Sequence, residues 1–263
     1  MKKPTTSRLA AADSVAALGE AARLLAPGAA NTTRRTFLRR SLTLGGLALL
    51  GGCSITDNES VEVALENISR FNDRVQASLF DPTRLAPTYP DSMITRPFPY
   101  NAYYAESKIR QVDGASWRLE LSGLVADRRP WTLAQLRMLP QVEQTTRHIC
   151  VEGWSAIGKW GGVPFAQFLR RIGADLSAKY VGFKCADDYY TSIDMPTALH
   201  PQTVLALTYD GQVLPAKYGY PVKLRMPTKL GYKNPKHIQA IFVTNTYPGG
   251  YWEDQGYNWF GGS

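Results

Sequence analysis

Cysteine and histidine are scarce in this chain, with three of each among 263 residues. Three cysteines cannot build a framework of several disulfides, so a small disulfide-rich scaffold is excluded. Long apolar runs are missing as well, because the apolar stretch at residues 42–50 is shorter than the roughly 20 residues that cross a bilayer. The hydrophobic content of 44% is nevertheless enough for an ordinary globular core.

The chain also carries almost no net charge outside its first 52 residues. These residues hold eight of the 30 basic and two of the 22 acidic residues, so +6 of the net charge of +8 lies there. The rest of the chain is nearly balanced at +2. It therefore lacks the basic footprint of a nucleic-acid-binding protein, and we expect no nucleic-acid partner.

The N-terminal segment has the pattern of an export signal. Residues 33–39, with Arg34 and Arg35 as a pair, precede the apolar stretch 42–50, an order typical of twin-arginine signals. We therefore interpret residues 1–53 as a twin-arginine signal segment of a periplasmic protein that is exported already folded. Leu-Gly-Gly-Cys at residues 50–53 is similar to a lipobox, which predicts acylation of Cys53 and a membrane tether. Ordinary cleavage nearby, with no role for Cys53, is the alternative.

The remaining chain divides near residue 112. Residues 54–112 contain five spaced prolines between 82 and 99, which predict an extended arm with one short helix near residues 61–71. Residues 113–263 alternate short apolar runs with two or three helical segments, which predicts a single α+β domain. Thr132 and Gln135 form a capping box for a helix that ends at Pro140, and a second helix spans 164–173. The expected strands are 117–121, 180–185, 204–209, 213–214, 222–226 and 238–244, with a turn at Asp210-Gly211.

Two thiols remain if Cys53 is acylated, and their spacing leaves several interpretations open. In an oxidising compartment, Cys150 and Cys185 could form a disulfide. His148 and Cys150 would share one face of a strand and could bind zinc, although the usual paired ligands are missing elsewhere. The acidic pair Asp187-Asp188 is interpreted as a loop, and Asp194 as a helix N-cap.

Residues 147–155 read Arg-His-Ile-Cys-Val-Glu-Gly-Trp-Ser and are followed by Trp-Gly-Gly-Val-Pro at 160–164. This pair of motifs resembles the cysteine loop of the YedY-like proteins in the sulfite oxidase superfamily. The resemblance implies a mixed-sheet molybdopterin-binding domain of sulfite-oxidase type, with molybdenum and molybdopterin as cofactors and Cys150 as the protein ligand to the metal. A soft thiolate suits a redox-active transition metal. Cys185 is then predicted to stay a free thiol.

Further site residues follow from the same resemblance. Residues 100–104 resemble a pterin-contacting segment, and residues 221–227 and 231–236 resemble a phosphate-holding strand and turn. The implied cofactor-binding residues are Asn101, Tyr104, Ala105, Cys150, Cys185, Tyr218, Lys223, Asn234, Pro235 and Lys236. Ala105, Cys185, Tyr218 and Lys223 stand where the family has Glu, Thr, a small polar residue and Arg, respectively. Arg147 is the second catalytic candidate, facing the substrate, with a surface salt bridge as its alternative.

Strand periodicity supports the phosphate assignment. If residues 222–226 form a strand, Lys223 and Arg225 share one face, while the apolar residues between and beside them share the other. Cations on one face, with Lys236 as a third, would bind a phosphate through charge-assisted hydrogen bonds. A solvated strand face is the alternative.

The resemblance implies two-electron or oxygen-atom-transfer chemistry on a small or sulfoxide-type substrate, with a haem-containing membrane or cytochrome redox partner. Two alternatives remain: a sulfite-oxidase-type dehydrogenase, and a non-enzymatic periplasmic binding lipoprotein. We expect a monomer. The aromatic C-terminal residues 247–260 are expected to pack on the body of the domain, with docking to a partner as the alternative.

Overall fold

The structure, a computed structural model, describes residues 59–263. The predicted signal segment, the lipobox and Cys53 lie outside the described residues. Within the described part, no helix has the length and apolar character needed to cross a membrane. The description starts with helix α3 (Glu59–Leu79) and continues into the predicted extended arm.

The helix at the start of the predicted arm is longer in the structure than expected. The prolines begin only at Pro82, so nothing interrupts the helical sequence before that point, and α3 runs for 21 residues. The expected short helix at 61–71 was therefore wrong in length. The segment after α3 is extended, as predicted, with two single 3-10 turns at Asp91–Met93 and Glu106–Lys108.

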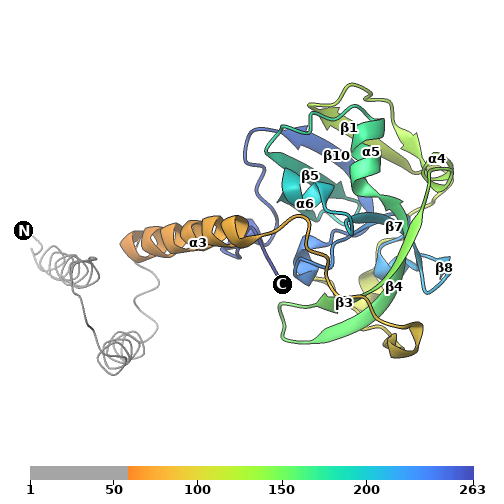
Figure 1. The fold of residues 1–263 in the computed structure, drawn as a ribbon, viewed down its shortest axis with the longest axis horizontal. Coiled ribbons are helices and arrows are strands. Elements are labelled where there is room, and N and C mark those ends of the chain that lie inside the picture. The colour runs from red at the N-terminus through yellow and green to blue at the C-terminus, as the bar shows by residue number, and fades with distance from the viewer. Residues whose placement is uncertain (1–58) are drawn as a thin grey trace, which may run out of the picture. The chain divides into compact units, whose positions relative to one another are not determined.

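The domain contains two five-stranded sheets (Figure 1). The first has the order β2-β1-β10-β5-β6, and it is mixed because β1 and β10 are parallel. The second has the order β3-β4-β7-β8, with β9 also paired to β7. The strands are β1 (Arg118–Gly123), β2 (Trp131–Thr132), β3 (Val142–Ile149), β4 (Ser155–Pro164), β5 (Tyr180–Cys185), β6 (Tyr190–Asp194), β7 (Val204–Tyr209), β8 (Gln212–Val213), β9 (Lys223–Arg225) and β10 (Ile238–Thr244).

Three short helices complete the domain: α4 (Leu133–Arg137), α5 (Phe165–Arg171) and α6 (Met195–Leu199). The α+β prediction is confirmed. The Thr132–Gln135 capping box is present with both reciprocal bonds. Asp210 and Gly211 both have positive φ values, as a two-residue hairpin turn requires. Asp194 occupies the N-cap position of α6, but its side chain makes no capping hydrogen bond.

The largest apolar core contains side chains from both sheets and from α4 and α5. Leu224 of β9 belongs to this core, whereas Trp160 of β4 belongs to a second, aromatic cluster with Phe98, Tyr209 and Tyr218. Successive residues of β4 face opposite sides of the sheet, so β4 contributes Val163 to the first cluster and Trp160 to the second. The second sheet therefore has the main core on one face and an aromatic cluster on the other.

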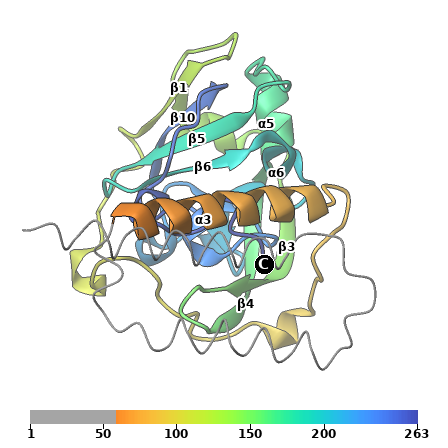
Figure 2. The same cartoon turned by 90° about the vertical axis from the view of Figure 1, so that its left-hand side faces the viewer.

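The C-terminal aromatic segment packs on the domain, as predicted. Trp259 Nε1 donates to Ser192 Oγ at 2.9 Å, and Tyr190 donates to Asp254 Oδ2 at 2.6 Å. A buried ion pair joins Lys233 to Glu253. In Figure 1, α3 projects from one side of the domain, with its C-terminal end close to the end of the chain, and in Figure 2 it crosses in front of the domain.

Candidate cofactor site

Cys150 lies at the tip of the hairpin formed by β3 and β4, which was not among the predicted strands. Cys150 N donates to Trp154 O at 2.9 Å, and Gly153 N donates back to Cys150 O at 3.2 Å. The three residues between Cys150 and Trp154 thus form a tight loop, and Gly153 adopts φ +90°. The hairpin holds the cysteine backbone in one conformation.

The Cys150 thiol is 7% exposed, and its Sγ lies 3.5 Å from Glu152 Oε2. Burial, followed by the charge of Glu152, raises the pKa of Cys150. Cys150 and Cys185 are both free cysteines, as predicted for Cys185, so no disulfide consumes the proposed metal ligand. Among residues 59–263, no group of three or more His, Cys, Asp or Glu side chains could hold a metal ion. A metal delivered inside an organic cofactor needs fewer ligands from the protein, so a lone thiol is compatible with that chemistry.

His148, two residues before Cys150, lies between Asn101 of the arm and a group of buried cations. Its Nε2 lies 3.4 Å from Asn101 Nδ2, which brings the arm to β3. Burial, followed by the charges of Arg225, Lys223 and Lys236, lowers the pKa of His148 well below its usual value. A side chain at Gly231 would approach His148 Nε2 to 2.7 Å, so glycine is needed where this turn passes the imidazole.

Three buried cations gather beside His148: Lys223, Arg225 and Lys236 are 2%, 0% and 8% exposed. Burial lowers the pKa of Lys236 to about 8, and burial with neighbouring positive charge lowers the pKa of Lys223 strongly. The ion pairs made by the described residues include none of the three. We call these three residues the cationic cluster. Its charge has no close carboxylate partner.

Asn234 organises the cationic cluster. Its side-chain oxygen accepts from Met226 N at 2.7 Å and from Arg225 Nη1 at 3.3 Å, while its carbonyl accepts from Lys223 Nζ at 3.1 Å. The next residue, Pro235, accepts from Leu224 N at 3.0 Å. The predicted residues Asn234 and Pro235 thus hold β9 in place, and one face of β9 is cationic, as the alternation predicted.

Several buried polar atoms beside the cluster have no hydrogen-bond partner: Arg225 Nε, His148 Nδ1, Trp160 Nε1 and Tyr100 Oη. Buried polar atoms are normally paired, so these four atoms beside the cluster are available to hydrogen-bond a ligand. Lys223 and Arg225 both lie over the Trp160 ring, at 5.7 and 5.9 Å from its centroid. Cations, free donors and an aromatic surface fit an anionic group attached to a heteroaromatic ring.

Three more of the predicted residues hydrogen-bond to other parts of the protein. Lys236 Nζ donates to Lys217 O at 3.0 Å, and Tyr218 Oη donates to Phe98 O at 2.9 Å. Tyr104 donates to Asp187 Oδ2 at 2.8 Å, so the phenol already has a protein acceptor. Cys185 is buried at the end of β5, and Ala105 is exposed. Their roles toward the cofactor stay predictions.

Arg147 is exposed and points away from His148, because neighbouring residues of β3 face opposite sides. Its guanidinium lies over the Tyr89 ring at 5.3 Å. It lines a groove of about 570 Å³ with Ile149, Arg84 and Phe260. Its carbonyl, rather than its side chain, contacts the cationic cluster by accepting from Arg225 Nη2 at 2.6 Å. The predicted substrate-facing role of Arg147 thus lacks a contact in the cluster.

His148 and Trp160 were not among the predicted cofactor-binding residues, whereas Arg225 was expected beside Lys223 as a phosphate-binding cation. Strand alternation already put Arg225 on the face of Lys223, and His148 and Trp160 both lie inside the two motifs that indicated the family. These signals were present in the sequence. The contact of Arg225 Nη2 with Thr146 Oγ1, at 3.1 Å, joins residues 79 positions apart and had no local signal.

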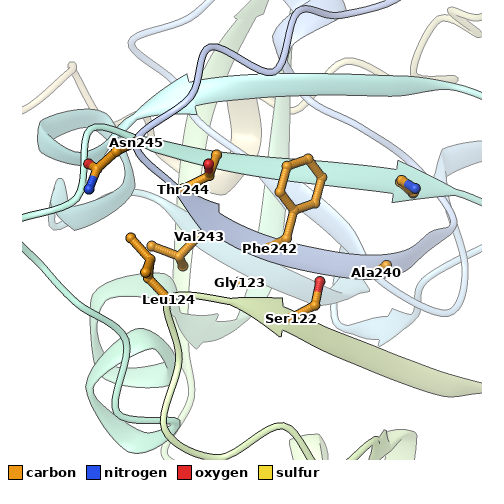
Figure 3. A pocket seen from close by; sticks show the side chains of 9 residues that line it. Ser122, Gly123, Leu124, Ala240, Phe242, Val243, Thr244 and Asn245 are labelled. Carbon is orange, nitrogen blue, oxygen red and sulfur yellow. The ribbon is translucent and has the colours of Figure 1, made fainter.

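A separate hollow of about 550 Å³ lies on the first sheet, along β1 and β10 (Figure 3). The Phe242 side chain stands on this face, between Ala240 and Thr244. Its lining includes one charged residue, Lys184, and none of the predicted site residues. This hollow is therefore not part of the candidate cofactor site.

Comparison with known proteins identifies the family of this chain. Residues 106–252 match the family described as oxidoreductase molybdopterin binding domain. A protein of Azospira oryzae, provisionally named protein-methionine-sulfoxide reductase subunit YedZ1, is 76% identical over 230 residues, 88% of each chain. The protein-methionine-sulfoxide reductase catalytic subunits MsrP of Ralstonia nicotianae and Burkholderia mallei are 32% identical over 161 residues, 55% of this chain and 49% of theirs. The solved sulfane dehydrogenase SoxCD of Paracoccus pantotrophus aligns with a TM-score of 0.49 and 20% identity, covering 52% of this chain and 40% of that one.

The chain therefore belongs to the oxidoreductase molybdopterin-binding domain family. Within it, the chain is a YedY-like member of the sulfite oxidase superfamily, which confirms the resemblance carried by the cysteine loop. It is a molybdopterin-dependent oxidoreductase. The match to the MsrP proteins spans about half of their length.

Proposed function

We propose that this protein is a periplasmic molybdenum enzyme that reduces sulfoxides, with methionine sulfoxide in proteins as the substrate class. The observation that carries the cofactor assignment is the cationic cluster, whose three buried charges lack a carboxylate partner beside four unpaired polar atoms. The cysteine hairpin continues directly from β3, the strand that carries His148 to this cluster.

Each part of the site has a distinct role in this proposal. Lys223, Arg225 and Lys236 would hold the phosphate of molybdopterin, and Asn234 would keep the first two in position. The Cys150 thiolate would bind molybdenum, since coordination keeps a thiol deprotonated despite its buried surroundings. When bound, the cofactor supplies two-electron redox and oxygen-atom-transfer chemistry. His148 and Asn101 would orient it from the side of the arm.

The substrate class rests on the relatives, whose names assign them to protein-methionine-sulfoxide reductases. Reduction of a sulfoxide consumes two electrons and two protons and yields a thioether and water. We infer that a haem-containing membrane or cytochrome partner supplies the electrons. Export by the twin-arginine route and a tether through Cys53 complete the proposal.

A matched pair of variants tests the cofactor site. Lys236 and Lys229 are both buried lysines that donate to a backbone carbonyl, at 3.0 and 2.9 Å, but only Lys236 belongs to the cationic cluster. After expression in a native host, Lys236→Met should lose most of its molybdenum and pterin, measured by elemental mass spectrometry and by pterin fluorescence after denaturation. Lys229→Met should keep both. Equal pterin content in the two variants would contradict the phosphate assignment.

The substrate is tested separately with the molybdenum-loaded protein and a reduced dye as electron donor. We expect dye oxidation with methionine sulfoxide, free or in an oxidised protein, and none with Cys150→Ala. If sulfite reduces the enzyme while no sulfoxide oxidises it, the protein is a sulfite-oxidase-type dehydrogenase and the proposed direction is wrong.

A further inference from the structure

Helix α3 contacts the domain through its polar side chains and exposes its apolar ones. Asp73 Oδ1 accepts from Phe260 N at 2.7 Å, and Gln76 Oε1 accepts from Gly262 N at 3.3 Å. By contrast, the exposed fractions are 54% for Leu65, 55% for Ile68 and 79% for Leu79. An amphipathic surface helix normally buries its apolar stripe. In α3, the domain leaves that stripe open.

The stripe has the spacing of a coiled coil. Leu65, Ile68, Asn72, Val75 and Leu79 follow one another at alternating steps of three and four residues, which makes them successive a and d positions of a heptad. The uninterrupted seam spans 15 residues, about 21 Å at 1.5 Å per residue. Apolar side chains that were exposed by chance would not need this regular spacing of three and four residues.

The polar residue within the seam also has a meaning in a coiled coil. Asn72 is an a position, flanked along the seam by Ile68 and Val75. One asparagine at an a position is a known device for fixing register and the number of strands, because it pairs with its counterpart in the partner helix. Two identical helices related by a two-fold axis would bring two copies of Asn72 together.

The charged residues of α3 lie outside the seam. The e and g positions beside it are Ser69, Gln76, Phe71 and Ser78, none of which is charged. The charged residues of this part, including Arg70, Asp73 and Arg74, occupy the outer b, c and f positions. Identical helices can therefore approach without like-charge repulsion at the seam.

We propose that α3 is a self-association element, which pairs with α3 of a second copy of this chain. A bilayer surface fits less well. The helix carries four acids, Glu59, Glu62, Glu66 and Asp73, against the two bases Arg70 and Arg74, whereas helices on anionic membranes are rich in Lys and Arg. Asn72 in the middle of the stripe would also lose hydrogen bonds in hydrocarbon.

The pairing is expected to be weak and dependent on concentration, because the seam of 15 residues is only about two heptads long. It departs from the monomer that the sequence predicted. It is independent of the proposed sulfoxide chemistry. Tethering two copies to one surface would raise their effective concentration and favour the dimer.

The test compares two double variants of the cofactor-loaded protein in sedimentation velocity over a series of concentrations. Ile68→Glu with Val75→Glu puts charge into the seam, while Asn67→Glu with Ala77→Glu adds the same charge at exposed positions outside it. The wild type and the second variant should show a reversible monomer–dimer equilibrium. The seam variant should dimerise at least about tenfold more weakly. Molybdenum content serves as a check that each variant is folded.

Crosslinking gives an independent readout of the same pairing. In a Cys53→Ser background, Asn72→Cys should form an intermolecular disulfide under mild oxidation if the helices are parallel and in register, and Arg70→Cys should not. A wild type that stays monomeric at every concentration would overturn the proposal. So would a dimer that the seam variant leaves unchanged, or a monomer that binds vesicles of anionic lipid through α3.

Discussion

At the scale of single residues, Arg225 separates what the sequence predicts from what only the folded structure shows. Its place beside Lys223 on one strand face follows from alternation along β9, which the sequence showed. Its buried bonds to Thr146 Oγ1 and to the Arg147 carbonyl come from β3 and depend on how distant strands meet. Sequence reasoning therefore found the charge but not the reason why it tolerates full burial.

Replacing the proposed metal ligand separates chemistry from folding. Cys150→Ala removes only a small, 7% exposed side chain, so the protein should keep its fold. Turnover should fall to background because the metal loses its protein ligand, as measured by dye-coupled sulfoxide reduction and circular dichroism. Cys185→Thr, a change at the other buried thiol, should keep molybdenum and most of the activity. Full activity of Cys150→Ala would refute the ligand assignment.

At the scale of elements, the regular parts were predictable and the pairing was not. The bounds of β5, β7 and β10 match the expectation because each is a run of six or seven residues rich in apolar and β-branched side chains. The β3–β4 hairpin escaped notice since its strands are rich in Thr, Gly and charged residues and are stabilised by pairing with each other. Its loop was found only through the family resemblance.

The cysteine hairpin can be tested with two matched glycines. Gly153 has φ +90° and Gly256 φ +92°, and neither has a heavy atom within 4 Å of an added Cβ. Alanine should therefore cost a similar amount at both positions, about 1–2 kcal/mol of strain in the left-handed region. Only Gly153→Ala should lower molybdenum content and activity, because it displaces the Cys150 backbone. Equal losses of activity would mean that general destabilisation, and not the loop, is responsible.

At the scale of the whole molecule, buried lysines couple stability to pH, and Lys229 is one of them. Burial lowers the pKa of Lys229 to about 7, although Asp194 lies 4.0 Å away. Between that value and the ordinary lysine pKa, the unfolded chain binds the proton that the native protein has lost. Stability contributed by this group therefore rises with pH above about 7 and is flat below it.

Replacing Lys229 should reduce the slope of thermal stability against pH. The midpoint of thermal unfolding should rise between pH 7 and about pH 10 in the wild type, and rise less in Lys229→Met. The variant also leaves the Phe260 carbonyl without its donor, which should cost about 1–3 kcal/mol at every pH. An unchanged slope in Lys229→Met would show that other groups control the pH dependence.

The export proposal is tested on the complete chain. Replacing Arg34 and Arg35 by Lys keeps the charge but removes the pair that defines the signal. The cofactor-loaded precursor should then stay in the cytosol, as measured by cell fractionation and immunoblotting. Undiminished amounts in the periplasm would indicate another route, and release of Cys53→Ser from membranes would support the tether.

The proposed role of the cationic cluster has a consequence for how the protein depends on its supply of cofactor. In the proposed complex, the phosphate of molybdopterin would offset the burial of these three cations, so the cofactor would act as a ligand that binds the native state and not the unfolded one. At a thousand times its dissociation constant, such a ligand adds about 4 kcal/mol to stability. A cell short of molybdopterin would thus hold a chain that opens more often and is degraded faster. The steady-state amount of the protein should therefore follow the activity of cofactor biosynthesis, without any change in transcription.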